Sequence, residues 1–325
     1  VARAPISLTY LGVAGWQLDA GPTTILVDPY FTRPADLDGP LVPDPAAIAA
    51  RAPKRADLIL VGHSHVDHLL DAPAVAQATG AQLLGSASTA RYARASGLAD
   101  ERVVPVRGGE DYAMAGYSVR VIPSLHSALG DKHVLGGEIA ATPAVPLRFA
   151  DFAEGGTFAY LVRVAGHQVL FLGTANFIER EVEGLRPDVA VIATGLREEI
   201  FDYTCRLMRA LGHPPLVYAN HFDDWRGPPV DESPDEDLQA FVAEVGYPIV
   251  MKPPAGLGSR GTMRVVDDES LEAALATLFV TPSNPAQAES FVKGEEHTFE
   301  TITIGGRPVW HSSSYYLPGP LEVLE

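Results

Sequence analysis

Short apolar segments separated by turn-forming residues predict a chain built mainly on β-strands. Residues 6–10 alternate between apolar side chains and hydroxyl groups, a pattern typical of a strand with one buried face. The continuous segment Leu-Ile-Leu-Val-Gly at 58–62 is short, branched and closed by glycine, as expected for a buried strand. Further strands are expected at 23–28, 82–84, 103–106, 117–122, 157–162, 168–172, 188–193 and 216–219.

Capping residues and glycines between these strands predict short helices. Asp44 followed by Pro45 has the pattern of an N-cap and a first helical residue, and it begins an alanine-rich helix. Asp71 is expected to cap a second helix that ends near Gly80, and residues 88–96 form a third. The predicted fold class is therefore α/β (α+β).

The segment His63-Ser64-His65-Val66-Asp67-His68 carries the strongest chemical signal in the chain. Three imidazoles and a carboxylate follow the buried strand 58–62 directly, at the kind of strand end where α/β folds place their ligands. A helix would put the first two histidines on different faces, whereas a tight loop can turn all four side chains toward one point. Zinc accepts imidazole nitrogen and carboxylate oxygen. The alternative, a solvated loop that is histidine-rich by chance, leaves this density of ligands unexplained.

Other strand ends supply similar side chains. Asp28 ends the strand 23–28, His126 follows the strand 117–122, and His221 follows the strand 216–219. Four separate strand ends therefore deliver candidate ligands, and we expect them to meet at one point. Residues 127–156 are rich in glycine, alanine and proline, so we expect a long loop over this site.

Two further expectations concern the second half of this region. Ala165-Gly166 is expected to form the turn of a hairpin between the strands 157–162 and 168–172. A helix is expected at 198–211, and it would hold the single cysteine, Cys205, in the core.

Composition narrows the functional classes. The chain has 325 residues, enough for about two domains. Its apolar fraction of 46% supports a sizeable core, and its net charge of −17 argues against nucleic acid or an anionic membrane as the main partner. No apolar segment is long enough to span a bilayer. We expect a cytoplasmic protein that acts on a small molecule. The start at Val1 fits either a removed leader or a fragment, and the oligomeric state is not predicted.

Beyond Asp231 the sequence changes character. Residues 228–237 are rich in proline and acidic side chains, and a helix is expected at 238–245. An apolar strand then ends at Lys252 and leads into a loop rich in glycine and serine at 256–262. Such a loop can present backbone N–H groups to a triphosphate, although taken alone it is more typical of a surface hairpin.

The pattern His-x-His-x-Asp-His with later strand-end histidines resembles the metallo-β-lactamase superfamily over about Ile6 to Asp231. The resemblance implies a four-layer αββα sandwich with metal at one edge of its two sheets. It implies a hydrolase acting through metal-activated water on an ester, lactone, amide or phosphodiester. The opening segments 9–12 and 28–29 look most like the branch that contains ascorbate-phosphate lactonase-like and phospholipase-D-like hydrolases.

The resemblance also implies roles for individual residues. Asp67 and His221 are the expected catalytic residues, Asp67 orienting the nucleophilic water, and Asp28 is expected to support a ligand histidine. Thr174 stands where the family has an aspartate that bridges two metals, so the number of bound zinc ions, one or two, remains open. The implied metal ligands are His63, His65 and His126 for a first ion, and Asp67, His68 and His221 for a second.

Residues 246–325 resemble the ATP-grasp ligases, which implies ATP and Mg²⁺ in this segment. The strand 247–253 matches their nucleotide-binding strand, and the helix 268–278 with residues 289–296 matches their adenine hinge. The family's substrate domain and its magnesium-binding strand are missing. The implied nucleotide contacts are Lys252 on phosphate, Gly256, Gly258 and Ser259 in the phosphate lid, Glu289 on the base, and Glu296.

We therefore predict a hydrolase domain at 1–232, a linker or helix at 233–245 and a partial ATP-grasp-like segment at 246–325. The tail is a truncated natural fusion, an artificial or misassembled join near Val245-Gly246, or a degenerate interaction module; the position of the join favours the second. Two functions compete with zinc-dependent hydrolysis: an ATP-dependent carboxylate ligase or a fusion of both, and a non-catalytic metal-binding protein, which Thr174 suggests.

Overall fold

The chain forms two units with separate apolar cores. The computed structural model describes residues 3–129, 134–227, 242, 246–253, 261–280, 286–291, 297–304 and 307–315. Contacts between residues divide the chain into Val1–Pro229 and Val230–Glu325. The first unit contains every metal ligand expected from the sequence.

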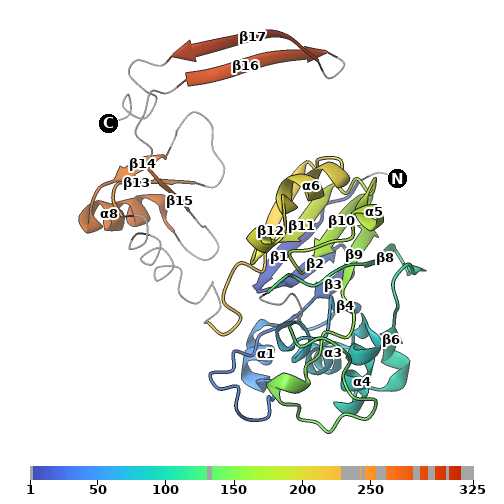
Figure 1. The fold of residues 1–325 in the computed structure, drawn as a ribbon. Helices are drawn as coiled ribbons and strands as arrows, with labels where there is room; N and C mark the ends of the chain where they lie inside the picture. The colour runs from blue at the N-terminus through green and yellow to red at the C-terminus, as the bar shows by residue number, and fades with distance from the viewer. Residues whose placement is uncertain are drawn as a thin grey trace. The chain divides into compact units, whose positions relative to one another are not determined.

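Within the described residues, the first unit is built on two six-stranded sheets, as Figure 1 shows. One sheet has the order β1-β2-β3-β4-β5-β6 and the other the order β12-β11-β10-β9-β8-β7. The strands are β1 (Ser7–Gly12), β2 (Gly15–Ala20), β3 (Thr23–Val27), β4 (Leu58–Leu60), β5 (Gln82–Gly85), β6 (Val103–Pro105), β7 (Asp111–Ala113), β8 (Tyr117–Pro123), β9 (Phe158–Val164), β10 (His167–Leu172), β11 (Val189–Ala193) and β12 (Leu216–Asn220).

Each sheet changes once from antiparallel to parallel strand pairing. The strands β1 to β3 are antiparallel, and β3 to β6 are parallel. In the other sheet β7 to β10 are antiparallel, and β10 to β12 are parallel. The helices connect mainly the parallel strands, as crossover connections require. They are α1 (Pro45–Arg51), α2 (Val66–Leu69), α3 (Ala72–Thr79), α4 (Ala87–Ala95), α5 (Glu179–Val182) and α6 (Tyr203–Ala210), with 3-10 turns at Asp100–Arg102, Phe149–Asp151 and Arg197–Glu199.

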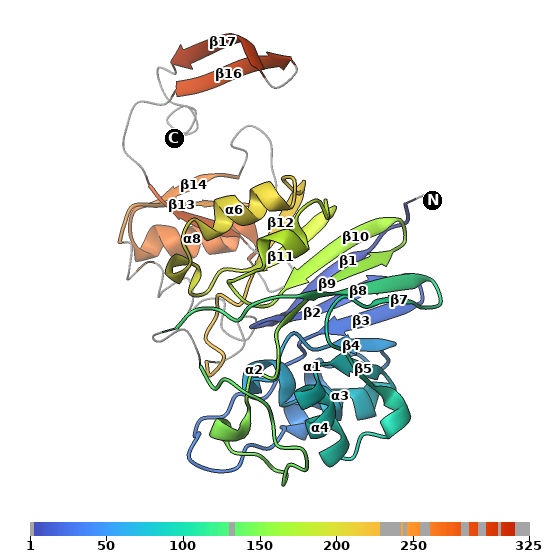
Figure 2. The same cartoon turned by 45° about the vertical axis from the view of Figure 1, so that its right-hand side comes forward.

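Alternating side chains assign each strand face to a different layer. On β4, Leu58 and Leu60 pack between the two sheets, and Ile59 packs beneath the helices α1 to α4. On β10, Phe171 faces the space between the sheets, and Leu170 packs toward α5 and α6. Three apolar layers therefore separate helix, sheet, sheet and helix. The first unit is the four-layer αββα sandwich expected from the sequence, and Figure 2 shows helices on its outer faces.

Most predicted elements are present, and the hairpin turn is confirmed. Ala165 and Gly166 have positive φ angles of 51° and 79°, and they join the antiparallel strands β9 and β10. The N-cap prediction at Asp44 is also confirmed, because its side chain accepts hydrogen bonds from the backbone N–H groups of Ala46 and Ala47. Residues 134–156 contain only the short 3-10 turn as regular structure, in agreement with the expected loop.

The prediction for Cys205 was wrong, because its side chain is exposed. The helix that carries it begins at Tyr203 rather than Glu198, since Asp202 adopts a left-handed φ of 47° and separates it from the preceding 3-10 turn. Tyr203 and Leu207 form the buried face of this short helix. Cys205 lies on its other side.

Asp71 occupies the N-cap position of α3, and Gly80 follows the end of this helix, as predicted. The Asp71 side chain, however, makes no cap hydrogen bond to α3. Instead the buried carboxylate accepts hydrogen bonds from the backbone N–H groups of Phe31 and Thr32, at 2.6 and 2.7 Å, and from the Thr32 hydroxyl at 2.6 Å. Thr32 Oγ1 in turn accepts a hydrogen bond from the backbone N–H of Asp44. Asp71 therefore orders the loop that follows β3.

The second unit has a small core of its own. A three-stranded antiparallel sheet with the order β14-β13-β15 packs against α8, where Asp267 accepts a hydrogen bond from the backbone N–H of Ser270 as N-cap. The helix expected at 268–278 is confirmed, and the helix expected at 238–245 lies outside the described residues except for Val242. The elements are β13 (Ile249–Lys252), β14 (Met263–Val265), α8 (Asp268–Leu278), β15 (Gln287–Ser290) and the antiparallel hairpin β16 (His297–Ile304) and β17 (Arg307–Tyr315).

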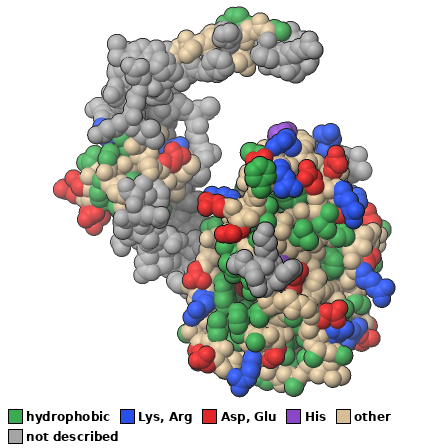
Figure 3. Space-filling model, viewed as in Figure 1, with side chains coloured by type: hydrophobic (Ala, Val, Ile, Leu, Met, Phe, Trp, Pro, Cys, Tyr) green, Lys and Arg blue, Asp and Glu red, His purple; other side chains and the backbone are tan. Residues whose placement is uncertain are grey.

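Two surface features bear on the functional classes. Acidic and basic side chains are interspersed over the face of the first unit that Figure 3 presents, so that face has no basic stripe. Among the helices of the described residues, none has the length and apolar composition needed to cross a bilayer.

Substitution Asp71→Ala should destabilise the chain by about 3 kcal/mol, because it leaves two buried N–H groups and one hydroxyl without an acceptor. Urea denaturation measures this loss. The matched substitution Asp38→Ala changes an exposed carboxylate on the same loop, and it should alter the free energy of unfolding by less than about 0.5 kcal/mol. Equal effects of both changes would contradict the role given to Asp71.

Candidate metal centre

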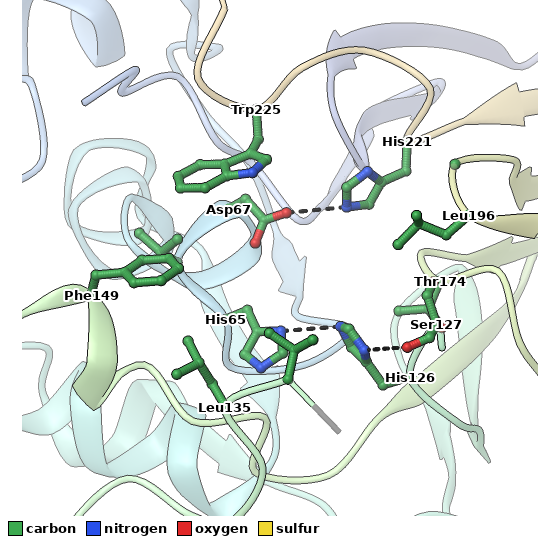
Figure 4. Close-up of a pocket in the computed structure, with 13 residues that line it drawn as sticks. His65, Asp67, His126, Ser127, Leu135, Phe149, Thr174, Leu196, His221 and Trp225 are labelled. Carbon is green, nitrogen blue, oxygen red and sulfur yellow. Dashed lines mark hydrogen bonds and ion pairs between the residues drawn. The ribbon is translucent and has the colours of Figure 1, made fainter. Parts of the chain in front are cut away.

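Three histidines from two segments bring their ring nitrogens together. His63 Nε2 lies 2.9 Å from His65 Nδ1, which lies 3.1 Å from His126 Nε2. Figure 4 shows the rings of His65 and His126 facing each other from different parts of the chain. All three donor atoms lie within 4.8 Å of one another, a separation that a single metal ion can span.

A second group of donors lies beside the first. Asp67 Oδ2 is 3.1 Å from His221 Nε2 and 3.6 Å from His68 Nε2. These three donor atoms also lie within 4.8 Å of one another. Figure 4 shows the imidazole of His221 directed at the carboxylate of Asp67. The structure therefore brings all six expected ligands together in two groups of three.

The local chain between β4 and α3 explains how one short motif serves both groups. The backbone is extended at His65, which is the N-cap residue of α2, so the sequence expectation of a single tight loop holds only up to this point. Asp67 and His68 lie in the first turn of this helix and form part of the second group. Ser64 Oγ lies 3.0 Å from both Ser86 Oγ and Thr89 Oγ1, so the intervening serine is held away from the metal ligands.

The remaining histidines come from the other sheet. His126 lies shortly after β8, and its Nδ1 donates to the backbone carbonyl of Ser127 at 2.8 Å, which leaves Nε2 as an acceptor for a metal. His221 follows β12 directly and has a left-handed φ of 53°. Its backbone N–H donates to the carbonyl of Val13 at 2.6 Å. Both sheets therefore contribute to the same site.

Asp28 supports His68 from behind. The buried carboxylate accepts a hydrogen bond from His68 Nδ1 at 2.8 Å and another from the backbone N–H of Gly62 at 2.6 Å. A Cβ atom at either Gly62 or Gly173 would lie 3.0 Å from Asp28 Oδ2. Glycine at these two positions lets three chain segments approach one carboxylate. The His68 ring is thereby fixed with Nε2 toward Asp67.

Burial and neighbouring charges set the protonation of the donors. Burial, reinforced by the surrounding imidazoles, holds the pKa of His63 well below its usual value and lowers the pKa of His65 to about 4. Burial alone would raise the pKa of Asp67, but His68 and His221 lower it overall. Burial alone would lower the pKa of His68, but Asp28 and Asp67 raise it. The lowered pKa values of His63, His65 and Asp67 favour the neutral imidazoles and the ionised carboxylate that bind metals.

The spacing of the donor atoms and an unpaired buried nitrogen suit a bound metal ion better than hydrogen bonds among the side chains. Nitrogen atoms that share a tetrahedral zinc at 2.0–2.1 Å lie roughly 3.3 Å apart, close to the spacing of the three-histidine group. His68 Nε2 is buried and has no hydrogen-bond partner among the described residues. An unpaired buried nitrogen is unfavourable without a ligand, and a cation at this position satisfies it.

Thr174 lies at the site but cannot replace a bridging carboxylate. It is buried, and its hydroxyl donates to the backbone carbonyl of Leu125 at 2.8 Å. It lines the cavity above the donors, which has a volume of about 190 Å³. The cavity floor includes His65, Asp67 and His221. The site thus offers two donor groups without a carboxylate from this position to join them.

Sequence reasoning missed the residue that fixes the His221 segment. Asp223 Oδ1 accepts hydrogen bonds from the Tyr10 hydroxyl at 2.5 Å and from the backbone N–H of Val13 at 2.9 Å. Val13 has a left-handed φ of 54°, and its carbonyl accepts from the backbone N–H of His221. The only signal in the sequence was a carboxylate two residues after a strand-end histidine. Its partners lie more than 200 residues earlier.

In the second unit, two of the expected nucleotide contacts pair with each other. Lys252 Nζ lies 2.8 Å from Glu289 Oε1, from the neighbouring strands β13 and β15. The expected contacts Gly256, Gly258, Ser259 and Glu296 lie outside the described residues. The described part of the segment therefore shows an ion pair at the position expected for phosphate and base.

Known proteins resemble both parts of the chain. The sequence model of the Beta-lactamase superfamily domain matches residues 23–213, and that of the carbamoyl-phosphate synthase L chain ATP binding domain matches residues 225–295. The UPF0173 metal-dependent hydrolase of Methanopyrus kandleri is 27% identical over 74% of this chain and 94% of its own length. The UPF0173 metal-dependent hydrolase of Heliobacterium modesticaldum is 27% identical over 73% of this chain and 88% of its own length.

Among solved structures, a metallo hydrolase of Ignicoccus hospitalis is 18% identical, with a TM-score of 0.47 over 73% of this chain and 91% of its own. The superfamily match covers more than half of the chain, and it includes the His63 to His68 motif and His126. The chain therefore belongs to the metallo-β-lactamase superfamily, in which it is a metal-dependent hydrolase.

Proposed function

We propose that the metal centre carries zinc and that the first unit hydrolyses an ester, a lactone or a phosphodiester. The observation that carries this proposal is the convergence of two donor groups, five imidazoles and one carboxylate, of which His65, Asp67, His126 and His221 line one cavity. Zinc suits this set because it accepts imidazole nitrogen and carboxylate oxygen without a strong geometric preference. When bound, zinc would lower the pKa of a coordinated water and polarise the scissile bond.

We assign one metal ion to each of the two donor groups. His63, His65 and His126 would hold the first ion, and Asp67, His68 and His221 the second. Because Thr174 supplies no carboxylate between them, each ion would have only the donors of its own group, and we expect the more exposed second group to bind its ion less tightly. This asymmetry allows a single firmly bound zinc in the native protein.

Asp67 and His221 are placed to act on the nucleophilic water. The side chain of Asp67 is 13% exposed and that of His221 is 25% exposed, whereas His68 is almost fully buried. Both partly exposed side chains border the cavity, so the carboxylate of Asp67 can orient a water molecule there. Asp28 holds the His68 ring in one orientation and keeps its donor atom directed at Asp67.

Asp223 positions His221 through the backbone. Its carboxylate holds the Val13 peptide in a left-handed turn, and the carbonyl of that turn accepts the backbone N–H of His221. Tyr10 donates to the same carboxylate and lies against the ring of Phe222, with centroids 5.3 Å apart. The orientation of the last ligand thus depends on contacts with the first strand of the chain.

The proposal concerns the first unit alone. In the second unit, nucleotide binding at Lys252 and Glu289 would have to break their ion pair. The sequence match over residues 225–295 supports an ATP-grasp-like origin for this segment, and we propose no reaction for it.

His65→Ala should abolish hydrolysis and weaken zinc binding by more than about 100-fold, since it removes the central donor of the three-histidine group. Zinc content after dialysis and hydrolysis rate measure the two effects. The control His213→Ala removes an exposed histidine outside both groups, and it should leave zinc content unchanged. Full zinc content in His65→Ala would refute the ligand assignment.

Thr174→Asp should increase affinity for the second zinc, because a carboxylate at this position can join the two donor groups. Titration with zinc against a competing chelator should then show two tight equivalents where the native chain shows one. Thr174→Asn is the matched control, because asparagine has nearly the size of aspartate but carries no charge. An identical stoichiometry in both variants would show that position 174 does not bridge.

Asp223→Asn should weaken the second zinc site by about 10- to 100-fold while the three-histidine site is retained, since only His221 loses its support. Tyr10→Phe should have a smaller effect in the same direction. The neighbouring Asp224→Asn, an exposed control, should have none. Equal weakening of both sites would indicate general destabilisation and would overturn the positioning role.

A further inference from the structure

The cavity above the metal centre is mainly apolar in its walls. Among the described residues, six apolar side chains line it: Val66, Val134, Leu135, Phe149, Leu196 and Trp225. Figure 4 shows Phe149, Leu135 and Trp225 around His65 and Asp67, with Leu196 beside His221 and Thr174. A substrate that reaches the donors must therefore place its non-reacting part against hydrocarbon.

Two aromatic residues from distant segments form one continuous wall. The rings of Phe149 and Trp225 are parallel within 4°, with centroids 5.8 Å apart. At this separation they pack on each other, and no further ring fits between them. Trp225 is also fixed through its backbone carbonyl, which accepts a hydrogen bond from Arg33 Nη1 at 3.2 Å. The wall is thus held in place before substrate binds.

The described lining carries no lysine or arginine. Enzymes that act on phosphate esters usually surround the anionic oxygens with cationic side chains or metal ions. Here the described walls offer no such side chain, so metal ions at the donors would be the only cations facing an anionic group. The charge distribution of the described walls therefore favours a neutral substrate over a phosphodiester.

The cavity also limits the size of the group that it can enclose. Its volume is about 190 Å³. An apolar cavity of about 150 Å³ holds one benzene molecule. The enclosed group should therefore be about the size of one ring.

We propose that the substrate is an uncharged carboxylic ester or lactone with an apolar group of about one ring beside the scissile bond; this inference rests on the proposed hydrolase function. The oxygen of water forms a bond to the acyl carbon, and the bond between that carbon and the leaving oxygen breaks. One proton of water passes to the leaving oxygen. The products are a carboxylic acid and an alcohol, or a hydroxy acid from a lactone.

Turnover of three p-nitrophenyl compounds by the zinc-loaded full chain tests the substrate class. The kcat/KM for p-nitrophenyl phenylacetate should exceed that for p-nitrophenyl acetate by at least about tenfold, because the cavity can enclose the ring. Bis(p-nitrophenyl) phosphate should be the poorest of the three. Faster hydrolysis of the phosphodiester than of either ester would overturn the inference and leave the proposed hydrolase standing.

Introducing a positive charge into the wall, and separately outside it, gives a matched pair of variants. Leu196→Arg places a cation at the rim of the cavity, and it should lower kcat/KM for the phenylacetate by about tenfold through loss of apolar contact. Phe201→Arg adds the same charge at an exposed apolar residue outside the cavity lining, and it should change kcat/KM by less than about twofold. Equal effects of the two variants would overturn the role of the wall.

A binding measurement separates failure of the substrate class from failure of hydrolysis. Phenylacetone is uncharged, carries one ring and cannot be hydrolysed, and its binding should change the fluorescence of Trp225. The Trp225→Phe variant should lose this signal. Binding of phenylacetone without turnover of any ester would support the apolar cavity and overturn the proposed hydrolase. Absence of binding, with dimethyl phosphate bound instead, would overturn the inference.

Discussion

The buried carboxylate of Asp28 is the contact on which the arrangement of the metal centre depends. One oxygen accepts the backbone N–H of Gly62, immediately after β4, and the other accepts Nδ1 of His68 in α2. The same carboxylate therefore fixes both ends of the segment that carries four of the six donors. A buried carboxyl group is stable only when its oxygens are hydrogen-bonded, and these contacts satisfy that requirement. Gly62 and Gly173 leave the space that the carboxylate occupies.

The donor side chains of the site come from both sheets of the sandwich. The motif after β4 belongs to one sheet, whereas His126 and His221 follow strands of the other. Packing of the two sheets face to face, through side chains such as Leu60 and Phe171, is what brings the donors within reach of one ion. The core between the sheets is thus part of the metal site, because any change in sheet separation would pull the two sets of histidines apart.

The residues that differ from a symmetric two-metal site line the cavity and lie away from the Asp28 carboxylate. Thr174 donates its hydroxyl to Leu125 and contributes no charge, and the opposite wall is formed by apolar side chains such as Phe149 and Leu196. The proposed three-histidine zinc site and the apolar cavity walls are consistent with the proposed carbonyl substrate, which needs polarisation but little neutralisation of charge. The second unit adds an ion pair between Lys252 and Glu289, and its sequence matches a different family.

Features that depend on local chemistry could be predicted from the order of residues alone. The spacing of His63, His65, Asp67 and His68 after an apolar strand marked the candidate ligands, and the family resemblance carried by that motif implied the sandwich. These signals are readable because each strand and the polar residue at its end are neighbours in the chain. The exposed position of Cys205 was missed because a short amphipathic helix can begin at several residues, and only packing selects one.

The tertiary structure decided the contacts that join residues far apart in the chain. Asp71 looked like a helix cap, but it binds the loop after β3, and Asp223 reaches Tyr10 and Val13 from the far end of the first unit. Such hydrogen bonds leave no periodic pattern, since a carboxylate can accept equally well from any N–H that folding brings near it. The stacked wall of Phe149 and Trp225 arises in the same way, from two loops with no shared sequence signal. A local sequence motif therefore marked the candidate metal ligands, and three-dimensional packing specified their supports and the cavity above them.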